Sequence, residues 1–469
     1  MRLARVLAAL TALLSGGAQA GEEGRLLFFG DVMLGREVAR EVAMRHLSPW
    51  SQMTLPRADF AMANFEGAIG PPEGCRDAGS APCFAVAPEM PGHLAAAGFT
   101  AAGLANNHAD DLGGDGRAAT KHALRQAGVA PLDFADSPGF VRIGRRVVAV
   151  VAINRVVSRR GEIDPLPSLA AERKLRLARA LADWVVVFVH WGAELKDWPQ
   201  DSQRRDAAWA IAHGADAVFG HHPHVVAEPE CLDGRPVFFS LGNHVFDQKY
   251  PETKRGMGAD CRLRDGALSC RPLRTATPAN TAFPRLADEH PDDNAIAACA
   301  VPAGPGLEVA GRRLRPWGEP GRLMSGPTVL AGEAEGKPVW RMAGRPLLAA
   351  EAGVLEPGGR PMLVTVERHP SPIDGEDGPR PYVYDVTDHG LVARWRGSAL
   401  AWPLIDARLL PGGETMRLCA LHRADSFIRL DPASTATRTA VYRWNGFGFA
   451  AVKDEEAVAA CRRMYGETP

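Results

Sequence analysis

Short apolar runs that end in polar clusters recur in the first half of the chain, and three of them follow one another between residues 184 and 248. They lead into His190, into the sequence Gly-His-His-Pro-His at 220–224, and into Asn243. Continuous apolar runs of this length are typical of strands that are buried on both faces of a sheet. In such sheets the ligand site lies beyond the carboxyl ends of the strands. Because imidazoles recur at that edge, the pattern indicates a metal site.

The same alternation of strand, polar loop and helix extends toward the N-terminus. Apolar runs predict further strands at 26–31, 59–66 and 147–153, and the first two end in the carboxylates Asp31 and Glu66. Apolar residues spaced three and four apart, with start and stop signals, predict helices at 36–44, 91–98, 116–128, 169–182 and 201–213. This order of elements predicts an α/β fold.

The second half of the chain has a different pattern. Residues 250–322 are rich in Pro, Gly and Asp without a clear period, which predicts extended crossing segments and a linker. Short β-type runs follow, and Trp340, Trp395 and Trp444 recur at intervals of about 50 residues. We therefore expect a domain over 21–322, with the linker beginning near 250, and a smaller β-rich C-terminal domain over 323–469. One arrangement that fits the strands of this C-terminal domain is a set of propeller-like blades.

Composition and the first residues narrow the class of protein. The chain has 469 residues and a formal net charge of −1, which gives no support to nucleic-acid binding or polybasic membrane attachment. Arg2 and Arg5 precede an apolar run, and Ala18-Gln19-Ala20 has the form of a cleavage site. These features predict a signal peptide over 1–20 and a periplasmic or secreted protein. The apolar run is too short to span a bilayer, and no later one approaches that length.

Eight cysteines follow the predicted leader, and an even number in an oxidising compartment favours disulfides. Cys75 with Cys83, and Cys261 with Cys270, would close short local loops. The remaining connectivity stays open, because eight cysteines allow about 105 pairings. The paired C-x-x-C spacing of a structural zinc site does not occur.

The polar groups at the predicted strand ends form a set of metal-ligand types. They are Asp31, Asn64, Glu66, Asn107, His108, His190, His222, His224 and Asn243. Oxygen and nitrogen ligands suit one or two divalent ions of the Mn, Fe or Zn type. Two such ions would activate a water molecule and stabilise the leaving oxygen of a phosphoester. The alternative is a purely structural polar rim, because a lone buried histidine is usually a hydrogen-bonded core residue.

Six segments between residues 26 and 248 resemble, in order, the motifs of the CapA family of capsule or poly-γ-glutamate biosynthesis proteins. They are FGDVMLGR, ANFEGAI, ANNHADDLGGDG, VHWGAE, GADAVFGHHPHVV and SLGNHVFDQ. The resemblance implies a four-layer α/β/β/α sandwich similar to calcineurin-like metallophosphoesterases, with a two-metal site. It places Asp31, Glu66, Asn107, His190, His222 and His224 at metal-ligand positions, and His108 at the position that protonates the leaving group.

Two motifs depart from the phosphoesterase pattern, and His244 departs from the pattern of the CapA family. Met33 stands where the Asp-x-His motif has its histidine, although Asp-Val-Met is the expected form in CapA-like chains. Asn64-x-Glu66 replaces the bridging aspartate motif. A thioether is a poor ligand for a hard divalent ion, so one ion would be weakly held or absent. His244 occupies a position where the family more often has Phe, and it would either add a ligand or fill the rim.

The resemblance implies an exported CapA-like protein that acts in biosynthesis, release or handling of an anionic capsule polymer, with a metal-dependent hydrolase centre. We expect Trp191, Glu194 and Asn243 on the substrate side, and Glu194 could also orient a ligand imidazole. The expected partners are an anionic polymer or phosphoester substrate and other capsule-assembly proteins. Two alternatives remain: a general periplasmic metallophosphoesterase and a non-catalytic, polymer-binding scaffold.

Overall fold

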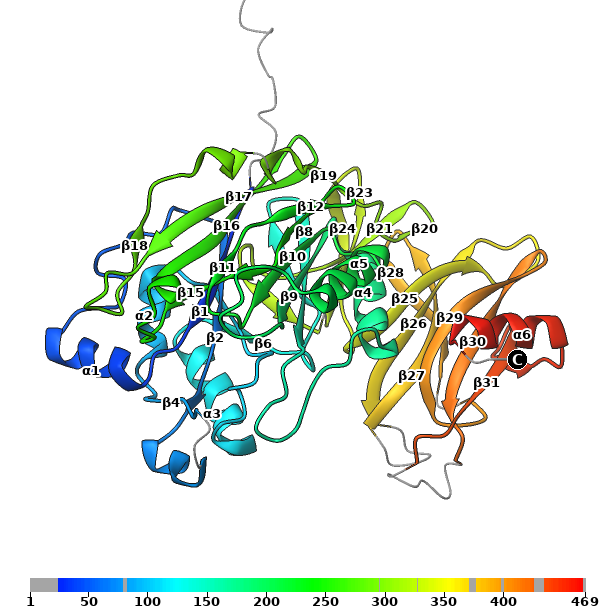
Figure 1. Ribbon diagram of the computed structural model, residues 1–469. Helices are drawn as coiled ribbons and strands as arrows, with labels where there is room; N and C mark the ends of the chain where they lie inside the picture. The colour runs from blue at the N-terminus through cyan, green and yellow to red at the C-terminus, as the bar shows by residue number, and fades with distance from the viewer. Residues whose placement is uncertain are drawn as a thin grey trace, which may run out of the picture.

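The structure is a computed structural model that describes residues 24–78, 82–294, 296–326, 328–370, 377–397, 400–425 and 434–466. The predicted signal peptide and its cleavage site lie outside these described residues. Figure 1 shows an α/β body at the left and a β-rich region at the right, which ends near the C-terminus. In the described part of the chain, no helix is long and apolar enough to cross a membrane.

A nine-stranded sheet forms one half of the α/β body, with the strand order β18-β17-β16-β1-β2-β5-β6. β15 pairs with the end of β1, and β19 pairs with β17. The strands β1, β2, β5, β6 and β15 are parallel, as expected for strands that alternate with helices. The bounds are β1 (Gly24–Val32), β2 (Phe60–Phe65), β5 (Ala101–Gly103), β6 (Ala130–Leu132), β15 (Asn243–Val245), β16 (Arg255–Arg264), β17 (Ala267–Ala276), β18 (Arg285–Leu286) and β19 (Val301–Pro302).

A seven-stranded sheet forms the other half, with the order β12-β13-β10-β9-β8-β7-β22. Its four central strands are parallel, and the edge strands are antiparallel to their neighbours. The bounds are β7 (Gly139–Ile143), β8 (Arg146–Asn154), β9 (Trp184–His190), β10 (Ala217–His221), β12 (Glu230–Leu232), β13 (Arg235–Phe238) and β22 (Leu323–Ser325). Two short pairs, β3 (Ala68–Ile69) with β4 (Ala85–Val86) and β11 (Val226–Ala227) with β14 (Ser240–Leu241), lie beside them.

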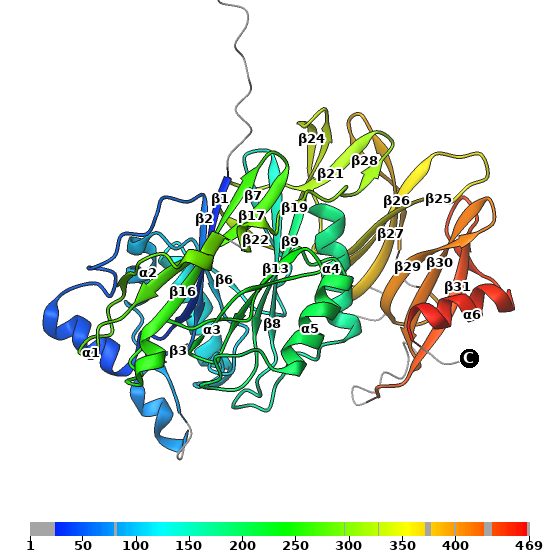
Figure 2. The ribbon, with the colours of Figure 1, turned by 45° about the horizontal axis from the view of Figure 1, so that its top comes forward.

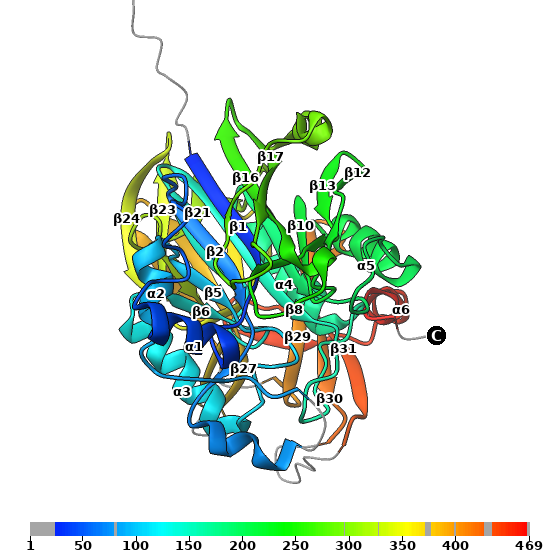
Figure 3. The ribbon, with the colours of Figure 1, turned by 60° about the vertical axis from the view of Figure 1, so that its left-hand side comes forward.

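The two sheets pack face to face, and helices cover both outer faces (Figure 2). The core between the sheets includes Phe28 of β1 stacked on Phe219 of β10, with 4.4 Å between ring centroids. Three helices cover the first sheet: α1 (Arg36–Arg45), α2 (Pro91–Ala97) and α3 (Gly113–Gln126). Two cover the second: α4 (Leu169–Leu181) and α5 (Asp201–Ala212). Figure 3 shows α1, α2 and α3 on one side and α5 on the other. The predicted four-layer α/β/β/α sandwich is therefore confirmed.

The structure corrects the expectation of an extended linker from about residue 250. β16 and β17 form a long hairpin that adds to the first sheet beside β1. The buried Asp260 of this hairpin pairs with Arg25 of β1, with Nε–Oδ1 and Nη2–Oδ2 distances of 2.7 and 2.8 Å. The hairpin has no strong signal in the sequence because its partner strand lies more than 200 residues earlier, and only pairing with that strand completes its hydrogen bonds.

The C-terminal region consists of three consecutive four-stranded antiparallel sheets and a final helix. The three recurring tryptophans, Trp340, Trp395 and Trp444, lie in β24, β28 and β31, one in each sheet. The strands are β20 (Glu308–Val309), β21 (Arg312–Pro316), β23 (Val329–Ala334) and β24 (Lys337–Ala343); β25 (Leu347–Val354), β26 (Pro361–Pro370), β27 (Asp377–Thr387) and β28 (Gly390–Arg396); and β29 (Leu404–Gly412), β30 (Thr415–Arg423), β31 (Thr437–Trp444) and β32 (Phe449–Ala451). The helix is α6 (Glu455–Met464). The predicted β-rich C-terminal region is present.

The chain crosses between the two regions near the expected boundary at residue 322. β21 precedes that residue but belongs to the first C-terminal sheet, whereas β22 follows it and pairs with β7 of the sandwich. The helix α4 lies between the second sheet and the strands β25 and β29 (Figure 1). Arg176 of α4 donates to Glu351 of β25 at 2.8 Å and to Asp406 of β29 at 2.7 Å. The C-terminal region is therefore tied to the sandwich by partly buried polar contacts.

All eight cysteines form disulfides. The two expected local pairs, Cys75–Cys83 and Cys261–Cys270, are present. The structure decides the other two pairings as Cys231–Cys299 and Cys419–Cys461, and the latter holds α6 against β30. These pairs join residues 68 and 42 positions apart, which no local spacing could reveal.

Asp183, between α4 and β9, is the polar centre of the contact between the two regions. Its two carboxylate oxygens accept from Arg315 of β21 at 2.7 and 2.9 Å, and they also accept from Arg313 and from the Val147 amide. Asp183 is 0% exposed and Arg315 3%. Burial raises the pKa of Asp183, but the hydrogen bonds and charge of Arg315 outweigh it and lower this pKa below its ordinary value.

We expect Asp183→Asn to lower the free energy of unfolding by about 3–5 kcal/mol, because it leaves the Arg315 charge buried without its partner. Since the folded pKa of Asp183 is lowered, its stabilising contribution is present above the unfolded pKa of about 3.9 and is lost as the pH falls through the folded value. Urea titrations of both forms between pH 7 and pH 3 would measure the two effects. Asp197→Asn, on an exposed loop, is the control. Equal stability of Asp183→Asn and the parent chain would contradict the role of this contact.

Candidate metal centre

The carboxyl ends of four strands meet at one edge of the sandwich. In the first sheet, Asp31 of β1 lies opposite Asn64 of β2. In the second sheet, His190 of β9 lies opposite His221 of β10. The backbone N–H of His222 donates to Asp31 across the sheets at 3.3 Å. The edge predicted from the sequence therefore exists, and residues from both sheets contact each other there.

The turn after β10 carries two of the predicted ligands in a strained backbone. His222 has a φ of 98° and His224 a φ of 60°, which side-chain-bearing residues rarely adopt. Such strain persists where the surrounding structure enforces it, often at functional sites. His221, immediately before the turn, is fully buried, and its ring lies 3.2 Å from the carbonyl oxygens of Val189 and Phe29. It links the two sheets behind the site, a role with no signal in the sequence.

Asp31, Glu66 and His190 form a first group around the amide of Asn64. The Asn64 Nδ2 donates to Asp31 at 2.8 Å and to Glu66 at 3.1 Å, and it lies 3.2 Å from His190 Nδ1. The other nitrogen of His190, Nε2, donates to Asn107 Oδ1 at 2.8 Å. The carboxylate and imidazole atoms of this group lie within 4.8 Å of one another, a spacing that could hold a metal ion.

Asn106 fixes the orientation of Asn64. It donates from Nδ2 to Asn64 Oδ1 at 3.1 Å and to the Phe65 carbonyl at 2.8 Å, and its Oδ1 accepts from the His108 amide. Because both backbone partners define which atom of Asn106 is the donor, Asn64 must present its oxygen to Asn106 and its NH₂ to the carboxylates. The sequence shows Asn106 next to Asn107, but this supporting role was not predicted.

The two carboxylates in the group oppose each other electrostatically. Burial and the charge of Asp31 raise the pKa of Glu66 well above its ordinary value. Burial also raises the pKa of Asp31, but the hydrogen bond and charge of His224 outweigh it and lower this pKa. His224 Nδ1 lies 3.1 Å from Asp31 and donates to Asn243 Oδ1 at 2.9 Å. A cation at this position would relieve the repulsion, since opposite charge favours the ionised carboxylates.

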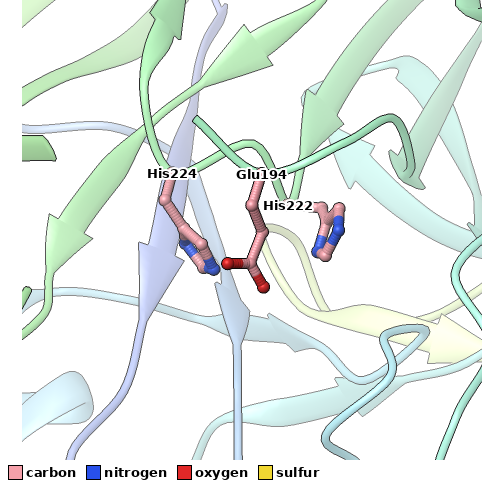
Figure 4. A group of neighbouring side chains, drawn as sticks. All are labelled: Glu194, His222 and His224. Carbon is pink, nitrogen blue, oxygen red and sulfur yellow. The ribbon is translucent and has the colours of Figure 1, made fainter. Parts of the chain in front are cut away.

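Glu194, His222 and His224 form a second group, whose ligand atoms also lie within 4.8 Å of one another. Figure 4 shows the Glu194 carboxylate between the two imidazoles. Glu194 is exposed, whereas the histidines are buried. His222 Nδ1 and Glu66 Oε2 have no hydrogen-bond partner among the described residues. Buried polar atoms are normally satisfied, so these two free atoms fit a metal site.

His108 lies beside the site in a fixed orientation. Its Nδ1 lies 2.9 Å from Asp111 Oδ2, and its ring stacks on Phe84 with 3.9 Å between centroids. The Asp111 carboxylate also accepts from the Phe84 amide at 2.7 Å. With Nδ1 held by a carboxylate, the other ring nitrogen is left for proton transfer. The role of Asp111 was not predicted, although its position three residues after His108 is a signal that could have indicated it.

Three other predicted positions have different environments. Trp191 is 2% exposed, donates to the Phe239 carbonyl at 2.9 Å and lies in the core under α4 and α5. It does not reach the site, because successive residues of a strand point to opposite faces and His190 takes the inner one. Asn243 orients His224 instead of facing open space. Met33 is buried in the core beneath α1–α3.

His244 is not near either ligand group. It lies among Phe29, Trp50 and Phe99, and its Nε2 accepts from Trp50 Nε1 at 2.9 Å. Burial lowers its pKa to about 3. His244 therefore neither adds a ligand nor fills the rim of the site, because it packs in the core under the helices.

These observations define the class of the fold as a four-layer α/β/β/α sandwich, with carboxylates, amides and imidazoles at the carboxyl ends of strands from both sheets. The family described as bacterial capsule synthesis protein PGA_cap matches residues 25–248. The match ends after β15, so the β16–β17 hairpin and the C-terminal region lie outside it.

Two curated relatives have descriptions that correspond to this family match. The capsule biosynthesis protein CapA of Bacillus anthracis is 29% identical over 274 residues, which cover 53% of this chain and 66% of that protein. The PGA biosynthesis protein CapA of Bacillus subtilis is 29% identical over 247 residues, which cover 48% and 64%. The chain thus spans slightly less than two thirds of either relative. A crystal structure of a phosphatase from Mycoplasma pneumoniae aligns with 61% of this chain and 96% of that one, at 12% identity and a TM-score of 0.33.

We expect His244→Gln to reduce the loss of stability on acidification between pH 6.5 and pH 4. Because the folded pKa of His244 is lowered, the unfolded chain takes up a proton first, and this favours unfolding as the pH falls below 6.5. The effect is at most about 1.4 kcal/mol per pH unit for one proton. Gln can still accept from Trp50. Thermal melts across this range would measure it, with His122→Gln on the exposed face of α3 as the control. If the parent chain, His244→Gln and His122→Gln lose stability in parallel as the pH falls, the lowered pKa of His244 is contradicted.

Proposed function

We propose that this chain is an exported protein of capsule biosynthesis that acts on an anionic surface polymer of the poly-γ-glutamate type through a metal-dependent hydrolase centre. The match of residues 25–248 to the capsule-synthesis family supports a role in capsule biosynthesis. The relative from Bacillus subtilis is named as a PGA biosynthesis protein, which supports the polymer. Disulfides at all eight cysteines are consistent with an oxidising compartment.

One observation carries the catalytic part of this proposal. Two fully buried carboxylates, Asp31 and Glu66, lie together with three imidazoles, and Glu66 Oε2 and His222 Nδ1 have no partner among the described residues. Leaving such an atom unsatisfied costs about 1–3 kcal/mol, a cost that a bound cation would offset. The residues that would hold metal are Asp31, Glu66, Asn107, His190, His222 and His224, with Glu194 added by its place in the second group. Bound metal would supply a water of lowered pKa and charge stabilisation.

The protein residues have separable roles in such a reaction. His108 would give a proton from Nε2 to the leaving oxygen, and Asp111 would keep its ring oriented. The backbone around His222 would hold Asp31 in place.

Positive side chains near the site support an anionic substrate. Arg159 and Arg160 are exposed on the loop after β8, on the same edge as the site. Arg159 Nη1 donates to the carbonyl of Asp111 at 3.5 Å, which links this loop to the orienting partner of His108. Both arginines also line a cavity with Asp110 and Leu112. A polymer of carboxylates would gain from these charges at low ionic strength.

His108→Ala is expected to lower turnover by about 10²–10⁴-fold while the metal content stays the same, because proton transfer is lost and no ligand is removed. Turnover would be followed with p-nitrophenyl phosphoesters and with poly-γ-glutamate, and bound metal by elemental analysis. Asp111→Asn should cause a smaller loss in the same direction. Metal binding without turnover of either substrate would favour the polymer-binding scaffold over the hydrolase.

The double variant Arg159→Ala/Arg160→Ala should bind poly-γ-glutamate several-fold more weakly and with less dependence on salt, because two charges near the site are removed. Co-sedimentation at 50 and 300 mM NaCl would measure this. Arg462→Ala/Arg463→Ala, which removes two exposed arginines from α6, is the matched control. If both double variants bind poly-γ-glutamate equally weakly, the effect of charge is nonspecific. That result would contradict polymer binding beside His108.

A further inference from the structure

We propose that the centre binds one divalent cation, between Glu66, Glu194, His222 and His224, and that the Asn64 amide occupies the position of a second ion. This inference rests on the metal centre proposed above and specifies how many ions it holds and where. It assigns Glu194 as a ligand, and it removes Asp31, Asn107 and His190 from the ligand set.

The first argument is the direction of the Asn64 amide. Its NH₂ group points between Asp31, Glu66 and His190, at 2.8, 3.1 and 3.2 Å. Asn106, whose own orientation is set by two backbone groups, prevents the amide from turning its oxygen inward. The amide therefore presents protons where an ion would need lone pairs. Two N–H groups satisfy part of the carboxylate charge there without a cation.

The second argument concerns His190. Its Nε2 donates to Asn107 Oδ1, and its Nδ1 lies 3.2 Å from Asn64 Nδ2. Asn64 has only two N–H groups, which are shared among Asp31, Glu66 and His190. The mutual contact occupies the Nε2 of His190 and one lone pair of the Asn107 oxygen. We therefore assign His190 and Asn107 to a hydrogen-bonded wall of the site.

The third argument is where the free ligand atoms lie. Glu66 Oε2 and His222 Nδ1 are buried and have no partner in the described part of the chain, and their residues are 0% and 6% exposed. Glu66 Oε2 lies 4.0 Å from His224 Nε2, the ring nitrogen opposite the one that bonds Asn243. The ligand atoms of Glu194, His222 and His224 lie within 4.8 Å of one another (Figure 4). Two imidazoles and two carboxylates suit Mn, Fe or Zn.

The loop that carries Glu194 is fixed against the histidine turn. The Leu195 amide donates to the carbonyl of Pro223 at 2.8 Å, and Pro223 lies between His222 and His224 in the chain. Gly192 and Leu195 have φ values of 86° and 60°, which bend the loop around Glu194. An exposed carboxylate is thereby held over two buried imidazoles, as a ligand on the solvent side of the ion would be.

The experiment counts ions and needs no activity. The full chain, stripped with chelator and dialysed against Mn²⁺, would be examined by elemental analysis, by isothermal titration and by the Mn²⁺ electron paramagnetic resonance spectrum. We expect one ion per chain. Glu194→Gln should raise the Kd for Mn²⁺ by more than about 100-fold, and Asn107→Ala by no more than about 10–100-fold, the scale of a supporting residue. Asp197→Asn, an equal charge change on the same loop, is the matched control and should leave the Kd unchanged.

The alternative outcomes separate this inference from the proposal on which it rests. Two ions per chain, or spin coupling between two Mn²⁺ ions, would overturn the single-ion assignment and leave the metal centre standing. One ion that survives Glu194→Gln but is lost in Asn107→Ala would place the ion at the other group and overturn the ligand assignment. If the chain binds no ion at all, the metal centre itself fails, and this inference fails with it.

Discussion

The site depends on a pair of like charges that the fold forces together. β1 and β2 are parallel neighbours, with Asp31 opposite Asn64 and Glu66 two residues further on, so the two carboxylates emerge close together inside the sandwich. Water cannot screen them there, because both are fully buried. The Asn64 amide between them and the imidazole of His224 against Asp31 reduce this repulsion. Burial and the charge of Asp31 together raise the pKa of Glu66.

Buried charges also lie where the C-terminal region meets the sandwich. Asp183 is buried beneath β21 and is neutralised by arginines from that strand, while Arg176 of α4 reaches β25 and β29. The region beyond the family match is therefore joined to the second sheet by buried ion pairs as well as by apolar packing. Asp183 directly precedes β9, the strand that ends at His190, so this contact lies at the opposite end of one of the strands that build the site.

Several features of the site could be predicted because they depend on residues close in sequence. The apolar runs and the polar clusters at their ends identify β1, β2, β9 and β10 and their ligand-type residues, and local spacing identifies two disulfides. Trp191 was misplaced because a one-residue step along a strand reverses the face. His244 lies on the helix-covered side of the first sheet, which the sequence does not distinguish from the site side.

The sequence by itself therefore determined the α/β class, the strand ends that meet in the polar cluster and the types of side chain found there. These follow from periodicity and local residue chemistry, which act over a few positions along the chain. Only the tertiary structure decided the β16–β17 hairpin, the two long-range disulfides and the division of the polar cluster into two groups. Those features depend on which atoms of distant residues come within hydrogen-bond distance. That choice is made when the two sheets pack, because each amide and imidazole must then find its partner inside the protein.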